Sequence, residues 1–227
     1  GSMPYIGEVI KLIRSELPAD IPLIGFGGAP FTLASYAVEG QGSRNYIHVK
    51  RLMLSDPGAF SALMGKMTSA AIDYLNYQIE EGVQAIQIFD SWVGALSVND
   101  YREHVFSHSQ RLIKAISGKV PVIHFGTGNS SLLPLMAAAG GDVIALDWRA
   151  PLLESWDLMG VKAVQGNLDP VALFAERASV FRSAQAVLDD VGGRPGHIFN
   201  LGHGILPETP VDNVKALVDF VHESTDR

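Results

Sequence analysis

Cysteine is absent from the 227-residue sequence. Its absence excludes disulfide bonds, zinc sites with thiolate ligands and catalysis by a thiol nucleophile. A chain without disulfides suits a reducing compartment, so we expect a cytoplasmic protein.

Positive charge is also scarce, because 17 Lys and Arg residues stand against 24 Asp and Glu residues, for a net charge of -7. This balance argues against a nucleic-acid partner, whose binding surface is normally basic. No apolar run approaches the roughly 18 residues that span a bilayer as a helix, so no membrane partner is expected. The 47% of hydrophobic residues still suffice for a sizeable core.

Two common site motifs are missing. Gly126-Thr127-Gly128 has the first spacing of a dinucleotide-binding G-x-G-x-x-G loop, but Ser131 stands where the third glycine belongs. No G-x-S-x-G elbow surrounds Ser91, so a triad of Ser91, His203 and Asp147 is only a weak hypothesis.

Short apolar segments alternate with amphipathic or capped segments along the whole chain. The apolar runs predict strands at 21–26, 83–89, 120–125, 143–146, 161–165 and 197–199. Periodicity and capping residues predict helices over 5–16, 44–55, 57–81, 97–116, 151–159, 170–175, 178–190 and 210–223, with a short Ala-rich helix before Gly140. Residues 31–38 are apolar and aromatic, and no element is assigned to them.

Strict alternation of strands and helices predicts an α/β fold with a parallel sheet. An open doubly wound sheet and a (β/α)8 TIM barrel both fit, and we favour the barrel because function-like residues follow every strand. About six βα units are visible where a barrel needs eight. We therefore expect residues 4–227 to form one incomplete TIM-barrel domain without its first strands, and Gly1-Ser2-Met3 to be an expression scar.

The strand ends carry the candidate site residues, each with a functional and a structural interpretation. His203 lies between two glycines after the last strand, so we expect it to be exposed and backbone to approach it closely on both sides. It could contact the substrate, act as a general acid or base, or be a loop histidine that binds backbone. Asp90 and Ser91 could supply a carboxylate and a hydroxyl to the barrel mouth, or Asp90 could cap a loop. The Tyr36 phenol could donate to an anionic substrate or pack on the rim.

Three further residues follow or lie in strands. His124 could bind a metal, but a lone strand histidine is more often a core residue, and no partner with metal-ligand spacing follows it. Asp147 and Asp169 could bind substrate or cap the next helix, and capping is favoured for Asp169 because Pro170 follows it.

Taken together, these strand ends resemble the uroporphyrinogen decarboxylase family. The matching blocks occur in family order and cover nearly the whole chain: Pro22–Leu33 (PLIGFGGAPFTL), Tyr36 with Glu39-Gly40, Gln87–Ser91 (QIFDS), Leu146–Trp148 (LDW), Gln165–Pro170 (QGNLDP) and Asn200–Gly204 (NLGHG).

The resemblance implies a TIM barrel with its site at the carboxyl ends of the strands. It implies a homodimeric carboxy-lyase that removes CO2 from the four acetate side chains of uroporphyrinogen and gives coproporphyrinogen in porphyrin and heme biosynthesis. It implies no metal and no organic cofactor. By the same resemblance, Tyr36, Ser91 and His203 match the family's substrate-binding tyrosine, serine and histidine.

One departure from the family pattern affects activity. The arginine-rich R-Q-A-G-R type segment has no counterpart here, and neither has the F-S-D-I type strand whose aspartate is given the central catalytic role. No catalytic residue is therefore assigned to this chain. We interpret it as an N-terminally truncated form, inactive alone, that associates through exposed barrel edges.

Two other functions remain as alternatives. A corrinoid-dependent methyltransferase of the same superfamily would bind zinc through an H-x-C motif at 122–126, which reads His124-Phe125-Gly126 here, in a chain without cysteine. A non-catalytic barrel fragment that serves as a dimerisation module is the other alternative.

Overall fold

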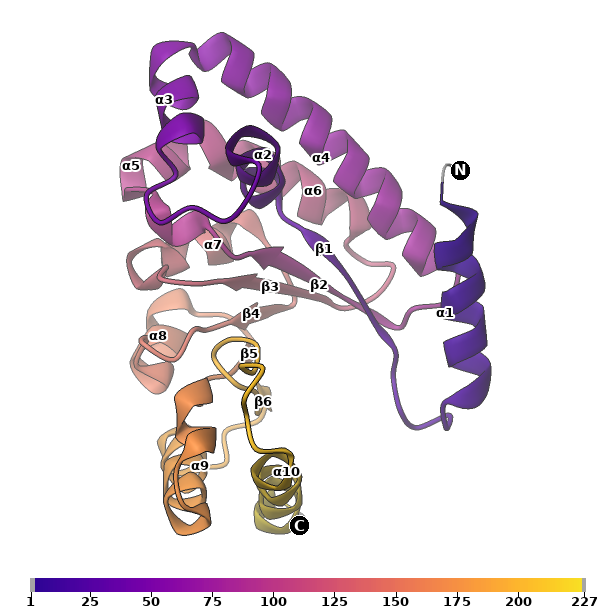
Figure 1. Ribbon diagram of the computed structural model, residues 1–227, viewed down its shortest axis with the longest axis vertical. Coiled ribbons are helices and arrows are strands. Elements are labelled where there is room, and N and C mark those ends of the chain that lie inside the picture. The colour runs from indigo at the N-terminus through magenta and orange to yellow at the C-terminus, as the bar shows by residue number, and fades with distance from the viewer. Residues whose placement is uncertain (1–2, 226–227) are drawn as a thin grey trace. The chain divides into compact units, whose positions relative to one another are not determined.

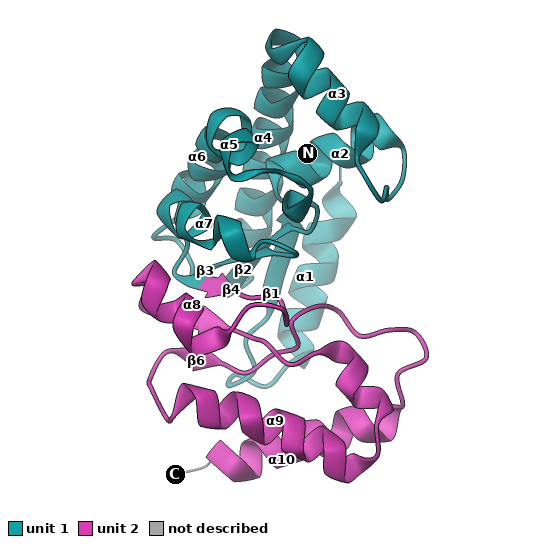
Figure 2. Cartoon of the chain, turned by 90° about the vertical axis from the view of Figure 1, so that its left-hand side faces the viewer, with its two compact units in different colours: residues 1–143 teal, residues 144–227 magenta. Residues whose placement is uncertain are grey.

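The computed structural model describes residues 3–225, which fall into two compact units, unit 1 up to Val143 and unit 2 from Ile144 (Figure 2). Residues 1 and 2 of the expected expression scar lie outside the described range. In unit 1 the elements are α1 (Pro4–Glu16), β1 (Ile24–Gly28), α2 (Pro30–Glu39), α3 (Ile47–Ser55), α4 (Pro57–Glu80), β2 (Ala85–Asp90), η1 (Val93–Ala95), α5 (Val98–Asp100), η2 (Tyr101–Val105), α6 (Phe106–Ile116), β3 (Val122–Gly126), η3 (Ser130–Leu132) and α7 (Leu133–Ala139).

Unit 2 continues the same alternation. Its elements are β4 (Val143–Ala145, which begins at the last residue of unit 1), α8 (Leu152–Met159), β5 (Val164–Gln165), η4 (Pro170–Phe174), α9 (Arg177–Val191), β6 (His197–Ile198) and α10 (Val211–Thr225). Within unit 2, β5 pairs in parallel with both β4 and β6. Both β5 and β6 are shorter than predicted, and beyond them the ladder continues as a single bridge between Leu168 and Leu201.

The sheet of unit 1 consists of β1, β2 and β3, all parallel and paired in chain order (Figure 1). Gly28 pairs with Phe89 and Asp90 pairs with Gly126, so the carboxyl ends of all three strands lie at one edge. Helices α4 and α6 pack against one face of this sheet. Their buried side chains form a core with alternate residues of β2, namely Ala71, Leu75, Ile86, Ile88, Leu112 and Ile116.

Strand β1 is built so that α4 can approach it closely. A Cβ on Gly25 would lie 2.7 Å from the Gln78 amide oxygen, and a Cβ on Gly27 would lie 3.0 Å from Leu75. The Gln78 side chain reaches the backbone of Phe26, accepting from its N–H at 3.1 Å and donating to its carbonyl at 2.8 Å. A side chain of α4 therefore occupies backbone groups of β1 that would otherwise be open to another strand.

Three helical segments begin with a side-chain cap. The Asp56 side chain accepts from the N–H of Ala59 at 3.0 Å, and the Asp169 side chain accepts from the N–H of Val171 at 2.9 Å. Ser97 and Asp100 form a capping box at the start of α5. Asp169 is thus a cap, as favoured, with its carboxylate used by the backbone.

The α/β alternation is confirmed, and two of the helices differ from those predicted. Residues 30–39, to which no element was assigned, form helix α2. The helix predicted over 97–116 contains a π-helical segment, η2, that turns Tyr101 and Val105 into the core. Among residues 3–225, no helix combines the length and apolar character required to cross a membrane.

Candidate functional site

Tyr36 and Ser91 lie at the carboxyl edge of the unit 1 sheet. Tyr36 is on α2, after β1, and Ser91 directly follows β2. The Tyr36 ring is half exposed and meets the Trp92 ring edge-on, with centroids 5.7 Å apart. The structure therefore brings the phenol and the Ser91 segment together within one unit.

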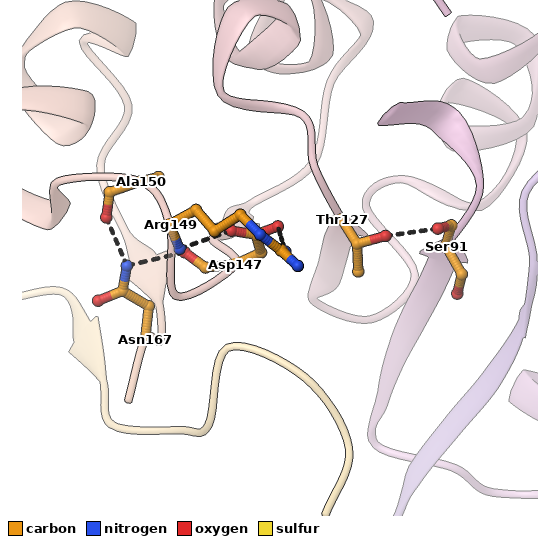
Figure 3. A network of polar contacts seen from close by, with 6 residues as sticks. All are labelled: Ser91, Thr127, Asp147, Arg149, Ala150 and Asn167. Carbon is orange, nitrogen blue, oxygen red and sulfur yellow. Dashed lines mark hydrogen bonds and ion pairs between the residues drawn. The ribbon is translucent and has the colours of Figure 1, made fainter. Parts of the chain in front are cut away.

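The backbone of Ser91 is fixed from the neighbouring strand. The Thr127 hydroxyl, which follows β3, donates to the Ser91 carbonyl at 2.5 Å (Figure 3). The residue that follows Ser91 is also held, because the Trp92 ring packs against the Tyr46 ring with centroids 5.4 Å apart. Contacts on both sides of the hydroxyl-bearing residue thus hold it at the sheet edge.

Asp90 does not line the open end of unit 1, contrary to the suggestion that it supplies a carboxylate there. It is fully buried because it shares the face of β2 that carries Ile86 and Ile88 toward the helices. Its Oδ1 accepts from the Thr32 hydroxyl at 3.0 Å, and its Oδ2 has no hydrogen-bond partner. Burial raises the pKa of Asp90 to about 7, and the Thr32 hydrogen bond only partly opposes that rise.

Unit 2 places an arginine at the end of β4. The fully buried Asp147 carboxylate accepts from the Arg149 backbone N–H at 2.7 Å and from Arg149 Nη1 at 2.8 Å (Figure 3). Asn167 Nδ2 donates to the carbonyls of Asp147 and Ala150 at 2.9 and 2.7 Å. Asp147 therefore holds Arg149 and shapes its loop, and it does not cap α8, whose N-cap is Pro151.

Arg149 and His203 flank the same indole. The Arg149 guanidinium carbon lies 3.7 Å from the centroid of the Trp148 ring, and its side chain is 55% exposed. The exposed His203 ring meets Trp148 edge-on, with centroids 6.2 Å apart. Unit 2 thus presents an imidazole and a guanidinium at one place, where the sequence had indicated only the imidazole.

The two glycines beside His203 are not equivalent. A Cβ on Gly202 would lie 2.8 Å from Trp148 Cα, and the Gly202 N–H donates to the Leu168 carbonyl at 2.7 Å. A Cβ on Gly204 would meet nothing within 4 Å. The expected close approach of backbone is therefore found on the Gly202 side alone.

His124 is buried in β3. Burial lowers the pKa of His124 to about 4, an effect that the backbone carbonyls of Gly140 and Met136 only partly offset. Neither ring nitrogen makes a hydrogen bond of good geometry. Within residues 3–225, no group of three His, Asp or Glu residues is arranged to hold a metal ion.

The fold is of the TIM-barrel α/β type. A solved methyltransferase from Methanosarcina mazei superimposes with a TM-score of 0.85 at 24% identity, over 100% of this chain and 66% of that chain. A B12-independent methionine synthase from Shewanella sp. W3-18-1 gives a TM-score of 0.64 at 14% identity, over 96% of this chain and 67% of that chain. At these identities the likeness concerns the fold alone.

The sequence defines the family. The family model described as uroporphyrinogen decarboxylase (URO-D) matches residues 1–224. A uroporphyrinogen decarboxylase of Sorangium cellulosum is 56% identical over 96% of this chain and 63% of its own length, and one of Carboxydothermus hydrogenoformans is 53% identical over 97% of this chain and 64% of its own length. The chain belongs to the uroporphyrinogen decarboxylase family and spans just under two thirds of these two relatives.

Proposed function

We propose that this chain supplies the substrate-holding part of a uroporphyrinogen decarboxylase. The observation that supports the proposal is the 56% identity with a named decarboxylase over 96% of the chain. The proposal treats residues 4–227 as one partial TIM-barrel domain. It includes a cytoplasmic location, a homodimer or higher assembly through exposed strand edges, and no nucleic-acid or membrane partner.

The reaction needs no metal or organic cofactor, because the pyrrole is its own electron sink. Protonation of a ring carbon next to an acetate side chain gives a cationic, imine-like ring. The bond between the acetate methylene and its carboxylate then breaks, CO2 leaves, and the electron pair moves into the ring. A proton added to the methylene and one lost from the ring restore the pyrrole, so a methyl group replaces each acetate.

The residues of this chain would hold and orient the substrate. The Tyr36 phenol and the Ser91 hydroxyl can donate to its carboxylates, and His203 donates most strongly when protonated. The family's arginine-rich and F-S-D-I type segments have no counterpart in this sequence. We therefore expect this chain alone to bind the tetrapyrrole without decarboxylating it.

Binding and turnover can be tested separately on the purified chain. Titration with uroporphyrin I, the stable oxidised form, is expected to show saturable binding, while incubation with uroporphyrinogen is expected to give no coproporphyrinogen. His203→Gln should weaken binding about tenfold, the effect of losing one charge-assisted hydrogen bond, whereas the exposed His222→Gln should not. Turnover by the chain alone would contradict the expected inactivity, and absence of binding would contradict the proposed function.

Arg149 is expected to contribute to the same binding. Its guanidinium is held by Asp147 and Trp148 with more than half of the side chain exposed, so it is oriented before a carboxylate arrives. Arg149→Gln should weaken uroporphyrin binding about tenfold or more, and Arg149→Lys should recover only part of that loss because lysine lacks the planar fork.

The control for Arg149 is Arg194, which belongs to the same unit and makes the same kinds of contact. Arg194 lies 4.1 Å from the centroid of Trp156 and 2.6 Å from Asp157. Arg194→Gln is expected to leave affinity unchanged. Urea unfolding of each variant separates lost affinity from the destabilisation caused by removing the guanidinium from the buried Asp147 carboxylate. Equal affinity in the two glutamine variants would exclude a binding role for Arg149.

A further inference from the structure

One hydroxyl contacts both neighbours of Ser91. Thr32 Oγ1 donates to Asp90 Oδ1 at 3.0 Å and accepts from the Trp92 backbone N–H at 3.4 Å. Thr32 is 4% exposed and Asp90 is fully buried, so water does not compete for these bonds. The residues directly before and directly after Ser91 are therefore both hydrogen-bonded to Thr32.

Helix α2 carries this threonine together with Tyr36. The two residues are four positions apart, about one helical turn, and so lie on the same face of one rigid element. Tyr36 in turn meets the Trp92 ring edge-on at 5.7 Å. Two contacts thus join α2 to the segment after β2, one through Thr32 and one through Tyr36.

Burying the Asp90 carboxyl costs folding free energy, which indicates that the hydrogen bond between Thr32 and Asp90 does more than fill the core. A buried carboxyl with one unpartnered oxygen destabilises a protein, and an apolar side chain of similar volume would be tolerated better there. Packing alone does not require a carboxyl next to Ile88. A hydrogen bond that fixes the position and direction of residues 90–92 requires a side-chain oxygen that accepts from Thr32, and the Asp90 carboxyl supplies it.

We propose that Thr32 is a positioning residue, which acts through Asp90 and the Trp92 backbone to fix the Ser91 hydroxyl and the Tyr36 phenol relative to each other. The Thr127 hydroxyl, which holds the Ser91 carbonyl, supplies the remaining restraint. The two fixed hydroxyls would bind a carboxylate of the tetrapyrrole. For the identity of this ligand, the inference rests on the proposed function.

Three substitutions in unit 1 test the proposal. Thr32→Val keeps the shape of the side chain and removes its hydroxyl, whereas Thr32→Ser keeps the hydroxyl. Thr68→Val is the control. Thr68 is also fully buried, but its hydroxyl donates to the Met64 carbonyl within α4. Thr32→Val is expected to weaken uroporphyrin I binding about tenfold, Thr32→Ser to return it to within about twofold of the parent, and Thr68→Val to leave it unchanged even if stability falls.

A double-mutant cycle distinguishes positioning from general loosening. If Thr32 positions Tyr36, Tyr36→Phe should cost much less affinity in the Thr32→Val background than in the parent. Additive effects, or equal losses in Thr32→Val and Thr68→Val, would overturn the proposal. Should Thr32→Val fail to fold, the pair Thr32→Val with Asp90→Leu removes the bond without leaving a buried carboxyl unpaired, and the same loss of affinity is expected.

A readout without ligand separates this inference from the proposed function. The Trp92 indole shifts the NMR resonances of the Tyr36 ring protons when the two rings are held edge-on. Thr32→Val is expected to move these resonances toward random-coil values, and Thr68→Val is not. If the parent binds no tetrapyrrole while the resonances move as expected, the proposed function fails and the positioning role stands. If the resonances do not move, the positioning role fails.

Discussion

Gly202→Ala is expected to destabilise unit 2 by roughly 3 kcal/mol and to abolish tetrapyrrole binding, because the added methyl group overlaps backbone that cannot yield. The new Cβ would lie 2.8 Å from Trp148 Cα, where no flexible side-chain end can move aside. The loop must shift, which breaks the bond between the Gly202 N–H and the Leu168 carbonyl. His203, the next residue, shifts with it.

Gly204→Ala is the matched control on the other side of His203. Nothing lies within 4 Å of its added Cβ, so stability and affinity should stay close to those of the parent. Urea unfolding and uroporphyrin titration of the two variants measure the contrast. Similar behaviour of the two variants would show that the packing of Gly202 on Trp148 does not fix the loop.

The second large effect is expected from Asp90→Asn, as a gain in stability that depends on pH. Burial raises the pKa of Asp90 from 3.8 to about 7. Below the lower value both the folded and unfolded states hold the proton, and no penalty exists. As pH rises from 3.8 to about 7, the unfolded chain releases the proton while the folded chain keeps it, so the free energy of unfolding falls. Above about 7 the full penalty remains.

Asparagine keeps the oxygen that accepts from Thr32 and carries no charge to desolvate. Asp90→Asn should therefore match the parent near pH 4 and exceed it at about pH 8 by up to roughly 4 kcal/mol. His124 contributes the opposite slope between its folded pKa of about 4 and its unfolded value of 6.5, but equally in both proteins, so it cancels in the difference.

Urea unfolding at a series of pH values measures this difference between parent and variant. Asp56→Asn, at an exposed helix cap where the two residues are equivalent, serves as the control and should follow the parent at every pH. A difference between Asp90→Asn and the parent that does not change with pH would show that the pKa of Asp90 is the same in the folded and the unfolded chain.

Periodicity and capping residues predicted most of the elements, and the helix that they missed has a physical explanation. Helix α2 buries Phe31, Thr32, Ala34 and Ser35, so little of it faces water and no polar stripe marks its period. Pro30 at its first turn and the left-handed Gly40 at its end were the available signals. The π-helical turn at Tyr101 has no local sequence pattern that predicts it, because its geometry is determined by the packing around it.

The candidate site could be proposed from residues near strand ends, but the direction of its side chains could not be predicted. Tyr36, Ser91 and His203 could be named from their motifs. The direction of Asp90 depends on which face of β2 meets the helices, and the preceding residues do not settle that. Arg149 was passed over because its placement depends on stacking over Trp148 and on a buried Asp147, two contacts that spacing alone does not reveal.

The bonds between Gln78 and Phe26 protect the edge of β1 against the addition of another strand. A strand arriving beside β1 must first displace a side-chain amide that already satisfies one backbone N–H and one carbonyl. Strand β6 pairs with β5, and its Ile198 is 43% exposed. Self-association by strand addition should therefore be selective for β6, and β1 should resist the promiscuous growth that turns open sheet edges into aggregates.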